Sequence, residues 1–106
     1  MDDVVELISE TSEVDEDFNA VGRTEARRVF CRVRSVSRAE FYAAGQAGLS
    51  PSLVLEVFYG EYAGERIALF HGKEYAVYRT YRDIESDTIE LYLEDKVGVT
   101  DGSTDR

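Results

Sequence analysis

Apolar and polar residues alternate in several short segments of this chain, and a period of two predicts β-strands. The alternation is cleanest over residues 89–94, where every second side chain is isoleucine or leucine. Residues 29–34 repeat it with one apolar face and one partly basic face. Residues 53–62 carry apolar side chains on both faces, which favours a strand covered on both sides, with a bulge at Gly60.

Turn residues divide the rest of the pattern into further strands and one helix. His71-Gly72-Lys73 separates residues 66–70 from residues 74–81, which predicts a β-hairpin. Ser37-Arg38-Ala39-Glu40 fits the capping box, in which the serine caps a helix and the glutamate reaches back to the serine amide. Gly45 and Gly48 then end a helix of about two to three turns.

The N-terminal quarter has a weaker pattern. Val4 to Ile8 predicts a short edge strand, and residues 9–26 are polar with little periodicity, which is typical of a long loop or a loose hairpin. We therefore expect one mainly β domain over residues 1–98, with the small polar residues 99–106 as a disordered tail. The expected fold is a small antiparallel β-barrel of about six strands, with one short α-helix in an inter-strand loop; the strand spacing also suits a sandwich.

The net charge of −10 is concentrated near the N-terminus. Residues 1–26 hold nine acidic side chains against Arg23 alone, whereas the acids and bases of the remaining residues almost balance. Binding of nucleic acid by a cationic surface is therefore not expected, since phosphate contacts need clustered lysine and arginine. An acidic protein that surrounds DNA would let the duplex slide past without adhering.

Several features predict a soluble protein of the reducing cytosol, or of a particle assembled there. The single cysteine excludes an intramolecular disulfide. The N-terminus lacks the basic and apolar regions of a signal peptide, and no apolar stretch approaches the roughly 20 residues of a membrane helix.

The residue types that carry catalysis do not form a recognisable set. His71, the only histidine, has no neighbouring carboxylate or nucleophile in the sequence, which favours an exposed turn residue over a general base. Cys31 lies on the apolar face of a predicted strand, which favours an inert core thiol. Phosphate-binding, dinucleotide-binding, zinc and serine-hydrolase motifs are absent from the sequence. We expect neither an enzyme nor a cofactor.

One acidic stretch resembles part of a calcium-binding loop. Asp15-x-Asp17-x-Asn19 matches the first half of an EF-hand, which then needs glycine at its sixth position and glutamate at its twelfth. Those positions hold Ala20 and Ala26, so a solvated charged loop is expected.

Five arginines and no acid lie between residues 27 and 38. Three interpretations of these arginines are open. They form a basic stripe that faces DNA or an acidic partner, or they form the solvent side of a strand and pair with acids of the same chain. In the third interpretation, they meet the acidic residues 1–26 of a neighbouring copy. The candidates for inter-subunit charge contacts are Arg28, Arg32, Arg34 and Arg38.

An ordered series of motifs resembles the SPP1-type phage head–tail adaptor, or head-closure, family of connector and stopper proteins. After the strand at Val29, the matching residues are Ser35-Val36-Ser37, Glu40-Phe41-Tyr42, Ala44-Gly45-Gln46, Gly48-Leu49, Pro51 and Tyr62-x-Gly64-Glu65. The motifs G-K-x-Y-x-V-Y-R-T-Y over residues 72–81 and I-E-L-Y-L-E over residues 89–94 follow. The resemblance covers about residues 4–98, and nothing is carried over to residues 12–26.

The resemblance implies a mostly antiparallel β-barrel that assembles into a dodecameric ring under the portal–adaptor complex after DNA packaging. Such a ring closes the DNA channel, keeps the genome inside and offers the tail a docking surface. The implied location is the virion head–tail interface, and the host cytoplasm during assembly. The implied partners are portal, adaptor and tail-completion proteins, with DNA only as cargo and no membrane. The ring is expected in the virion, and a monomer in isolation is compatible with it.

The segment between the second and third strands, residues 37–52, is then expected to act as the channel loop. Its candidate residues for the channel or for contacts between subunits are Ser37, Glu40, Phe41, Tyr42, Gln46, Leu49 and Pro51. The alternative is a small cytoplasmic prophage β-barrel that binds a protein partner without entering the virion.

Overall fold

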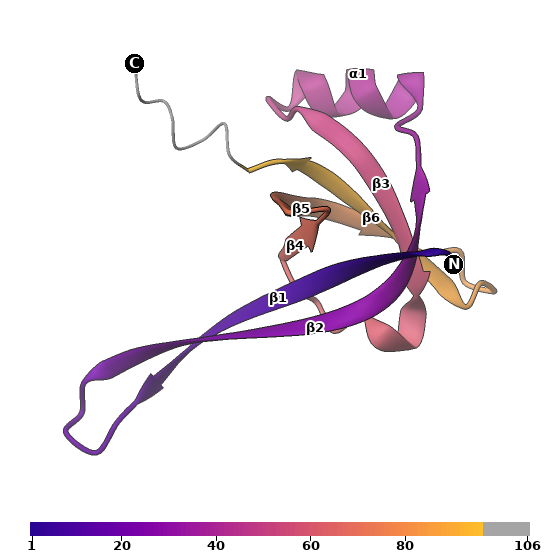
Figure 1. The fold of residues 1–106 in the computed structure, drawn as a ribbon. Helices are drawn as coiled ribbons and strands as arrows, with labels where there is room; N and C mark the ends of the chain where they lie inside the picture. Colours follow the sequence, from indigo (N-terminus) through magenta and orange to yellow (C-terminus); the bar gives the residue numbers. More distant parts are fainter. Residues whose placement is uncertain (97–106) are drawn as a thin grey trace.

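Six antiparallel strands close into a barrel in the computed structural model, which describes residues 1–96 (Figure 1). The strands are β1 (Asp3–Val14), β2 (Ala20–Arg34), β3 (Pro51–Phe58), β4 (Ile67–Phe70), β5 (Lys73–Tyr81) and β6 (Thr88–Asp95). Their order around the barrel is β1-β2-β3-β6-β5-β4, and β4 pairs back with β1. The helix α1 (Arg38–Gln46) connects β2 to β3. The predicted fold class is confirmed, whereas the predicted tail over 99–106 lies outside the described residues.

The barrel interior is filled by alternate side chains of all six strands. The core residues are Val5, Leu7, Val29, Cys31, Leu55, Val57, Ala68, Phe70, Tyr75, Val77, Ile89, Leu91 and Leu93. The predicted inward face of residues 89–94 is therefore confirmed. Burying each large aliphatic side chain stabilises the fold by about 1.5–3 kcal/mol, so this alternation is the main source of stability.

The strand predicted over residues 53–62 is shorter than its apolar pattern indicates. β3 ends at Phe58, and residues 59–61 form a 3₁₀ turn in which Gly60 lies, so the predicted bulge is wrong. The amide of Tyr59 still donates to the carbonyl of Asp87, in the register of the β3–β6 ladder, and the amide of Tyr62 then donates back to the carbonyl of Tyr59, which closes the turn. Cover on the second face is also incomplete, because Val54 is buried but Phe58 is 41% exposed.

The predicted hairpin between β4 and β5 is confirmed. His71 and Gly72 both have positive φ, 52° and 79°, as a two-residue turn of type I′ requires. Glycine adopts this conformation at no steric cost, which explains its place in the turn.

The prediction for residues 9–26 was right in its hairpin form and wrong as a loop. β1 and β2 pair without a break from Asp3 opposite Cys31 to Val14 opposite Ala20, so only residues 15–19 form a turn. Residues 10–25 project from the barrel as a two-stranded arm (Figure 1), which we call the arm. Both faces of the arm meet solvent, and a strand with no buried face has no apolar alternation to detect.

Within residues 1–96, no helix has the length and apolar content of a membrane span.

Candidate functional site

The helix between β2 and β3 begins as the sequence predicts, but through only half of the capping box. Ser37 is extended at the N-cap, and its hydroxyl accepts a hydrogen bond of 3.1 Å from the amide of Glu40. The side chain of Glu40 does not return to the serine amide. It reaches instead to β5, where two stronger donors are available.

Glu40 belongs to a polar cluster that ties α1 to β5 and β6, which we call the Glu40 cluster (Glu40, Tyr78, Arg79 and Tyr92). The Tyr78 hydroxyl donates to one carboxylate oxygen at 2.7 Å, and Arg79 donates to both oxygens. The guanidinium of Arg79 lies 3.8 Å from the centre of the Tyr92 ring. A charge-assisted, two-pronged contact of this kind fixes orientation as well as distance.

The electrostatics of the Glu40 cluster follow from these contacts. The hydrogen bonds from Arg79, joined by the one from Tyr78, outweigh partial burial and hold the pKa of Glu40 below its usual value. Burial and the hydrogen bond to Glu40 raise the pKa of Tyr78. Glu40 is therefore an anion and Tyr78 a neutral donor at pH 7, so the cluster is a static connection and not a proton relay.

The end of the helix is closed by a Schellman motif. The amide of Leu49 donates to the carbonyl of Ala44, and the amide of Gly48 donates to that of Gly45. Gly48 has a φ of 83°, which the motif requires at this position. The amide of Ser50 then donates to the Glu94 carboxylate, so the segment is held at both ends.

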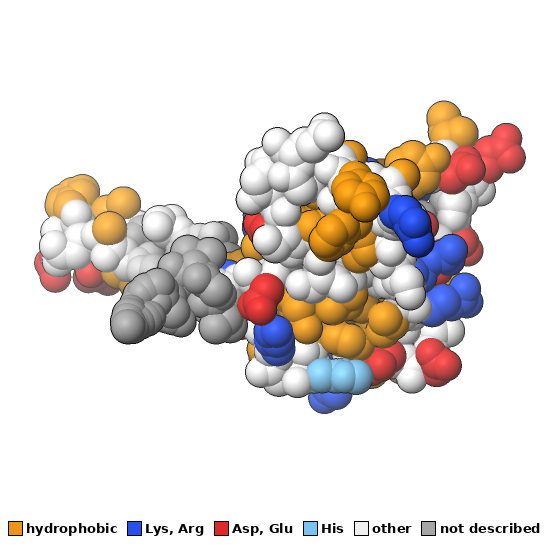
Figure 2. All heavy atoms as spheres, turned by 90° about the horizontal axis from the view of Figure 1, so that it is seen from above, with side chains coloured by type: hydrophobic (Ala, Val, Ile, Leu, Met, Phe, Trp, Pro, Cys, Tyr) orange, Lys and Arg blue, Asp and Glu red, His pale blue; other side chains and the backbone are white. Residues whose placement is uncertain are grey.

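The exposed side of the helix is aromatic. Phe41 and Tyr42 are 54% and 64% exposed, and their rings lie edge to face with centres 6.1 Å apart. With Val36, Ser37 and Arg38 they line an open cavity of about 480 Å³. Figure 2, which views the molecule from the side of α1, shows hydrophobic side chains gathered on this face. A solvent-exposed aromatic pair is typical of a protein contact surface.

The predicted channel-segment residues therefore fall into three groups. Ser37, Phe41, Tyr42 and Gln46 are exposed, Leu49 and Pro51 are partly buried, and Glu40 belongs to the Glu40 cluster. The structure brings all seven onto one segment. Their contact with a channel or a neighbouring subunit stays a prediction.

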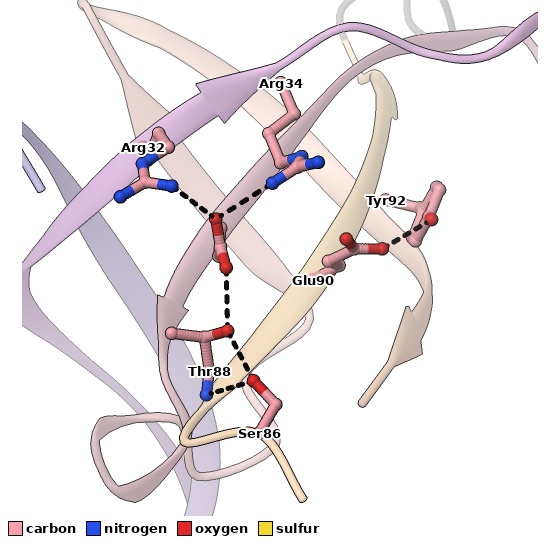
Figure 3. Close-up of polar contacts among 7 residues, drawn as sticks. Arg32, Arg34, Ser86, Thr88, Glu90 and Tyr92 are labelled. Atoms are coloured by element: carbon pink, nitrogen blue, oxygen red, sulfur yellow. Dashed lines mark hydrogen bonds and ion pairs between the residues drawn. The ribbon is translucent and has the colours of Figure 1, made fainter. Parts of the chain in front are cut away.

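Two of the four candidate arginines share one ion-pair partner within the chain (Figure 3). Arg32 and Arg34 extend from β2 to the Glu56 carboxylate at 3.6 and 3.3 Å. Thr88 donates to the other oxygen of Glu56 at 2.7 Å. That hydrogen bond, with the two arginines, outweighs burial and holds the pKa of Glu56 below its usual value. The interpretation in which arginines pair with acids of the same chain therefore holds for these two.

Arg28 and Arg38 differ from that pair. Both side chains are exposed, and neither has an ion-pair partner among residues 1–96. Glu6 lies opposite Arg28 in the strand register but forms no ion pair with it. Of the predicted inter-subunit arginines, these two keep a charge that is free to meet a partner.

The single histidine has a carboxylate partner that sequence reasoning missed. His71 Nε2 lies 3.0 Å from Asp3, and the ring stacks on Phe70 with centres 4.0 Å apart. The pairing holds the pKa of Asp3 below its usual value. Asp3 is 68 residues away in the chain, so no local signal could have found it. The predicted exposure of His71 is confirmed, since its side chain is 65% exposed.

Cys31 and the acidic turn also have structural explanations. Cys31 is fully buried, and burial raises the pKa of its thiol to about 11, which suits an inert core residue. Asp15 accepts hydrogen bonds from the amides of Asp17 and Asn19, so its carboxylate stabilises the turn of the arm. In the described part of the chain, no group of three or more candidate metal ligands is assembled.

Comparison with protein-family models, with curated proteins and with solved structures found no match.

Proposed function

We propose that this chain is a structural subunit of a tailed phage or prophage particle. Copies form a ring at the head–tail interface, close the DNA channel after packaging and give the tail a surface on which to dock. The action is steric and requires no catalysis. Its partners are the portal-side adaptor and the tail-completion proteins, and DNA is only cargo.

The position of α1 is the observation that carries this proposal. The resemblance read from the sequence implies one short helix between the second and third strands of an antiparallel barrel. α1 lies between β2 and β3 of a closed six-stranded antiparallel barrel, and its N-cap is Ser37, which belongs to the matching motif. This agreement of motif and architecture supports the family assignment.

The surface chemistry of the helix segment supports a contact role. Phe41 and Tyr42 project from a helix that is held at its first turn by Glu40 and at its far end by Ser50. A rigid support lets exposed aromatic side chains bind a partner with little loss of conformational entropy. The negative net charge suits a wall past which DNA must slide, and Glu56 offsets one of the two positive charges of Arg32 and Arg34.

Removal of the protein from phage assembly tests the proposal. Without it, we expect heads that package DNA but then lose it and do not join tails, and addition of the purified protein is expected to restore joining. Tailed particles that keep their DNA in its absence would overturn the proposal and favour the partner-binding cytoplasmic alternative.

A matched pair of variants tests the helix surface itself. Phe41→Ala combined with Tyr42→Ala is expected to abolish head–tail joining while the barrel stays folded, as judged by circular dichroism. Ile84→Ala removes an even more exposed apolar side chain from the β5–β6 turn and is expected to leave joining intact. Equal effects of the two variants would contradict a contact role for the helix.

A further inference from the structure

The arm lacks the support that the rest of the sheet has. Beyond the barrel, β1 and β2 pair only with each other: β4 contacts β1 over Glu6–Ile8, and β3 contacts β2 over Cys31–Arg34. Every side chain of residues 10–25 that the structure describes is exposed. An isolated two-stranded ribbon is marginally stable in water, so an arm of this length gains stability from a partner.

The tip of the arm combines apolar and acidic side chains. Phe18 is 86% exposed and Val14 is 67% exposed, beside the acidic residues 15–17. Figure 2 shows hydrophobic and acidic side chains together at this far end, on the left. Phe18 has a φ of 65°, a conformation that is uncommon for a bulky residue, and the hydrogen bonds of Asp15 hold the turn that presents it.

A complementary surface lies on the outer side of the barrel. Val4, Arg28, Val29 and Phe30 line a mainly apolar cavity of about 190 Å³, which we call the receiving pocket. Phe30 is 58% exposed at its rim, and Arg28 has no ion-pair partner in the described chain. A cavity of roughly 150 Å³ with apolar walls accepts a benzene molecule, so this one is large enough for a phenyl ring.

The charges of the two surfaces are complementary. The arm holds six acids and one arginine over residues 10–25. Arg28 stands at the receiving pocket, opposite Glu6 but not bonded to it. An aromatic side chain flanked by carboxylates therefore matches an apolar pocket flanked by a guanidinium.

The tip cannot reach the pocket of its own chain. Val4 pairs with Phe30 and Val14 pairs with Ala20, so the tip is ten residues further along the same two strands. At about 3.3 Å per residue, that is roughly 30 Å of continuous ladder pointing away from the pocket. The matching tip must come from another molecule.

We propose that the arm of one copy of this chain inserts Phe18 into the receiving pocket of a second copy, with the acids of the tip against Arg28. The interface joins two different surfaces, so it propagates from copy to copy and either closes into a ring or extends as a chain. This proposal rests on the proposed connector role in that it names the contact between subunits of the ring. The geometry of the arm and the receiving pocket does not depend on that role.

Association of the purified full-length chain is the direct test. NMR spectra recorded up to about 1 mM, which reveals dissociation constants in the millimolar range, are expected to show concentration-dependent shifts at Phe18 and at Arg28 and Phe30. Phe18→Ala is expected to weaken association about thirtyfold, the loss typical of a central aromatic anchor. Ile84→Ala, which removes another exposed apolar side chain, is the matched control and is expected to change nothing.

A charge exchange makes the test specific for this pairing. One variant carries Glu16→Lys with Asp17→Lys, and the other carries Arg28→Glu. Each alone is expected to remain monomeric, because like charges then meet at the interface. An equal mixture is expected to associate as the wild type does, since each tip again meets an opposite charge.

Three results would overturn the proposal: a wild-type monomer at every concentration, association that Phe18→Ala leaves as strong as in the wild type, or a mixture that stays monomeric. Undiminished association in Phe18→Ala would assign self-association to another surface, such as the open edges of the arm. The connector role would stand in each case if head–tail joining still required the protein, because that assay is read independently.

Discussion

Replacing Glu40 with glutamine measures how firmly α1 is held on the barrel. The Glu40 side chain is only 12% exposed and accepts hydrogen bonds from Tyr78 and Arg79. Glutamine keeps the shape but removes the charge, and its amide places a donor against the donors of Arg79. Hydrogen bonds to charged groups contribute about 1.5–3 kcal/mol, and the 42% exposure of Arg79 reduces this through solvent screening.

We expect Glu40→Gln to lower the free energy of unfolding by about 2 kcal/mol, or the melting temperature by roughly 10 °C in a domain of this size. The difference also depends on pH. Because the pKa of Glu40 is held below its usual value, its stabilising effect is complete above the ordinary glutamate range and is lost as the pH falls through the lowered pKa. The difference in the free energy of unfolding between wild type and variant is expected to be largest at pH 7 and to shrink below about pH 4.

Urea unfolding followed by circular dichroism, at pH 7 and at lower pH, gives the loss of stability and its dependence on pH. An m-value that is the same in wild type and variant indicates that the two free energies can be compared. Glu74→Gln is the matched control, since it removes an exposed ion pair with Lys96 and is expected to cost at most about 0.5 kcal/mol. A loss in Glu40→Gln no larger than in the control, or a gap that does not change with pH, would refute the reasoning.

Three further predictions concern the core and the base of the arm. Leu91→Ala empties a fully buried position and is expected to cost about 2–5 kcal/mol in urea unfolding; a cost under 1 kcal/mol would mean that the barrel interior is not packed there. Cys31 is expected to resist thiol reagents in the folded protein at pH 8 and to react at once in urea, because its thiol is buried with a pKa of about 11, so rapid native labelling would contradict the core assignment. Arg27→Ala removes the 2.6 Å contact to the buried Glu65 carboxylate and is expected to lower the free energy of unfolding by about 1–3 kcal/mol. Adding Glu65→Gln is expected to recover part of this loss, and additive losses in the double variant would disprove the pairing.

The elements that the sequence predicted well are those whose signal is local. Residues 89–94 alternate because one face of β6 is buried, and Ser37 marks the start of α1 because an N-cap needs only residues of the same turn. The same holds for Gly72, whose positive φ is set by a two-residue turn. Local periodicity and turn chemistry were enough for the class of fold and for the place of the single helix.

The misreading of Glu40 arose where a local signal had a tertiary competitor. The capping box predicts that the Glu40 side chain returns to Ser37, but Tyr78 and Arg79, 38 and 39 residues away, offer stronger hydrogen bonds. Those two partners have no trace in the neighbouring sequence. The strand predicted through Gly60 is a different case, because β3 stops at Phe58 where a 3₁₀ turn over residues 59–61 begins, closed by the bond from the Tyr62 amide to the Tyr59 carbonyl.

By itself, the sequence determined a mainly β chain with one helix, an acidic N-terminal segment and an apolar set large enough for one core, because each follows from residue type and short-range period. The tertiary structure alone decided which arginines have an ion-pair partner in the chain, since Arg32 and Arg34 find Glu56 only when β2 and β3 pair. It also decided that the acidic segment is an arm and not a loop. Strand pairing without burial leaves no apolar pattern, so only the register of β1 against β2 could reveal it.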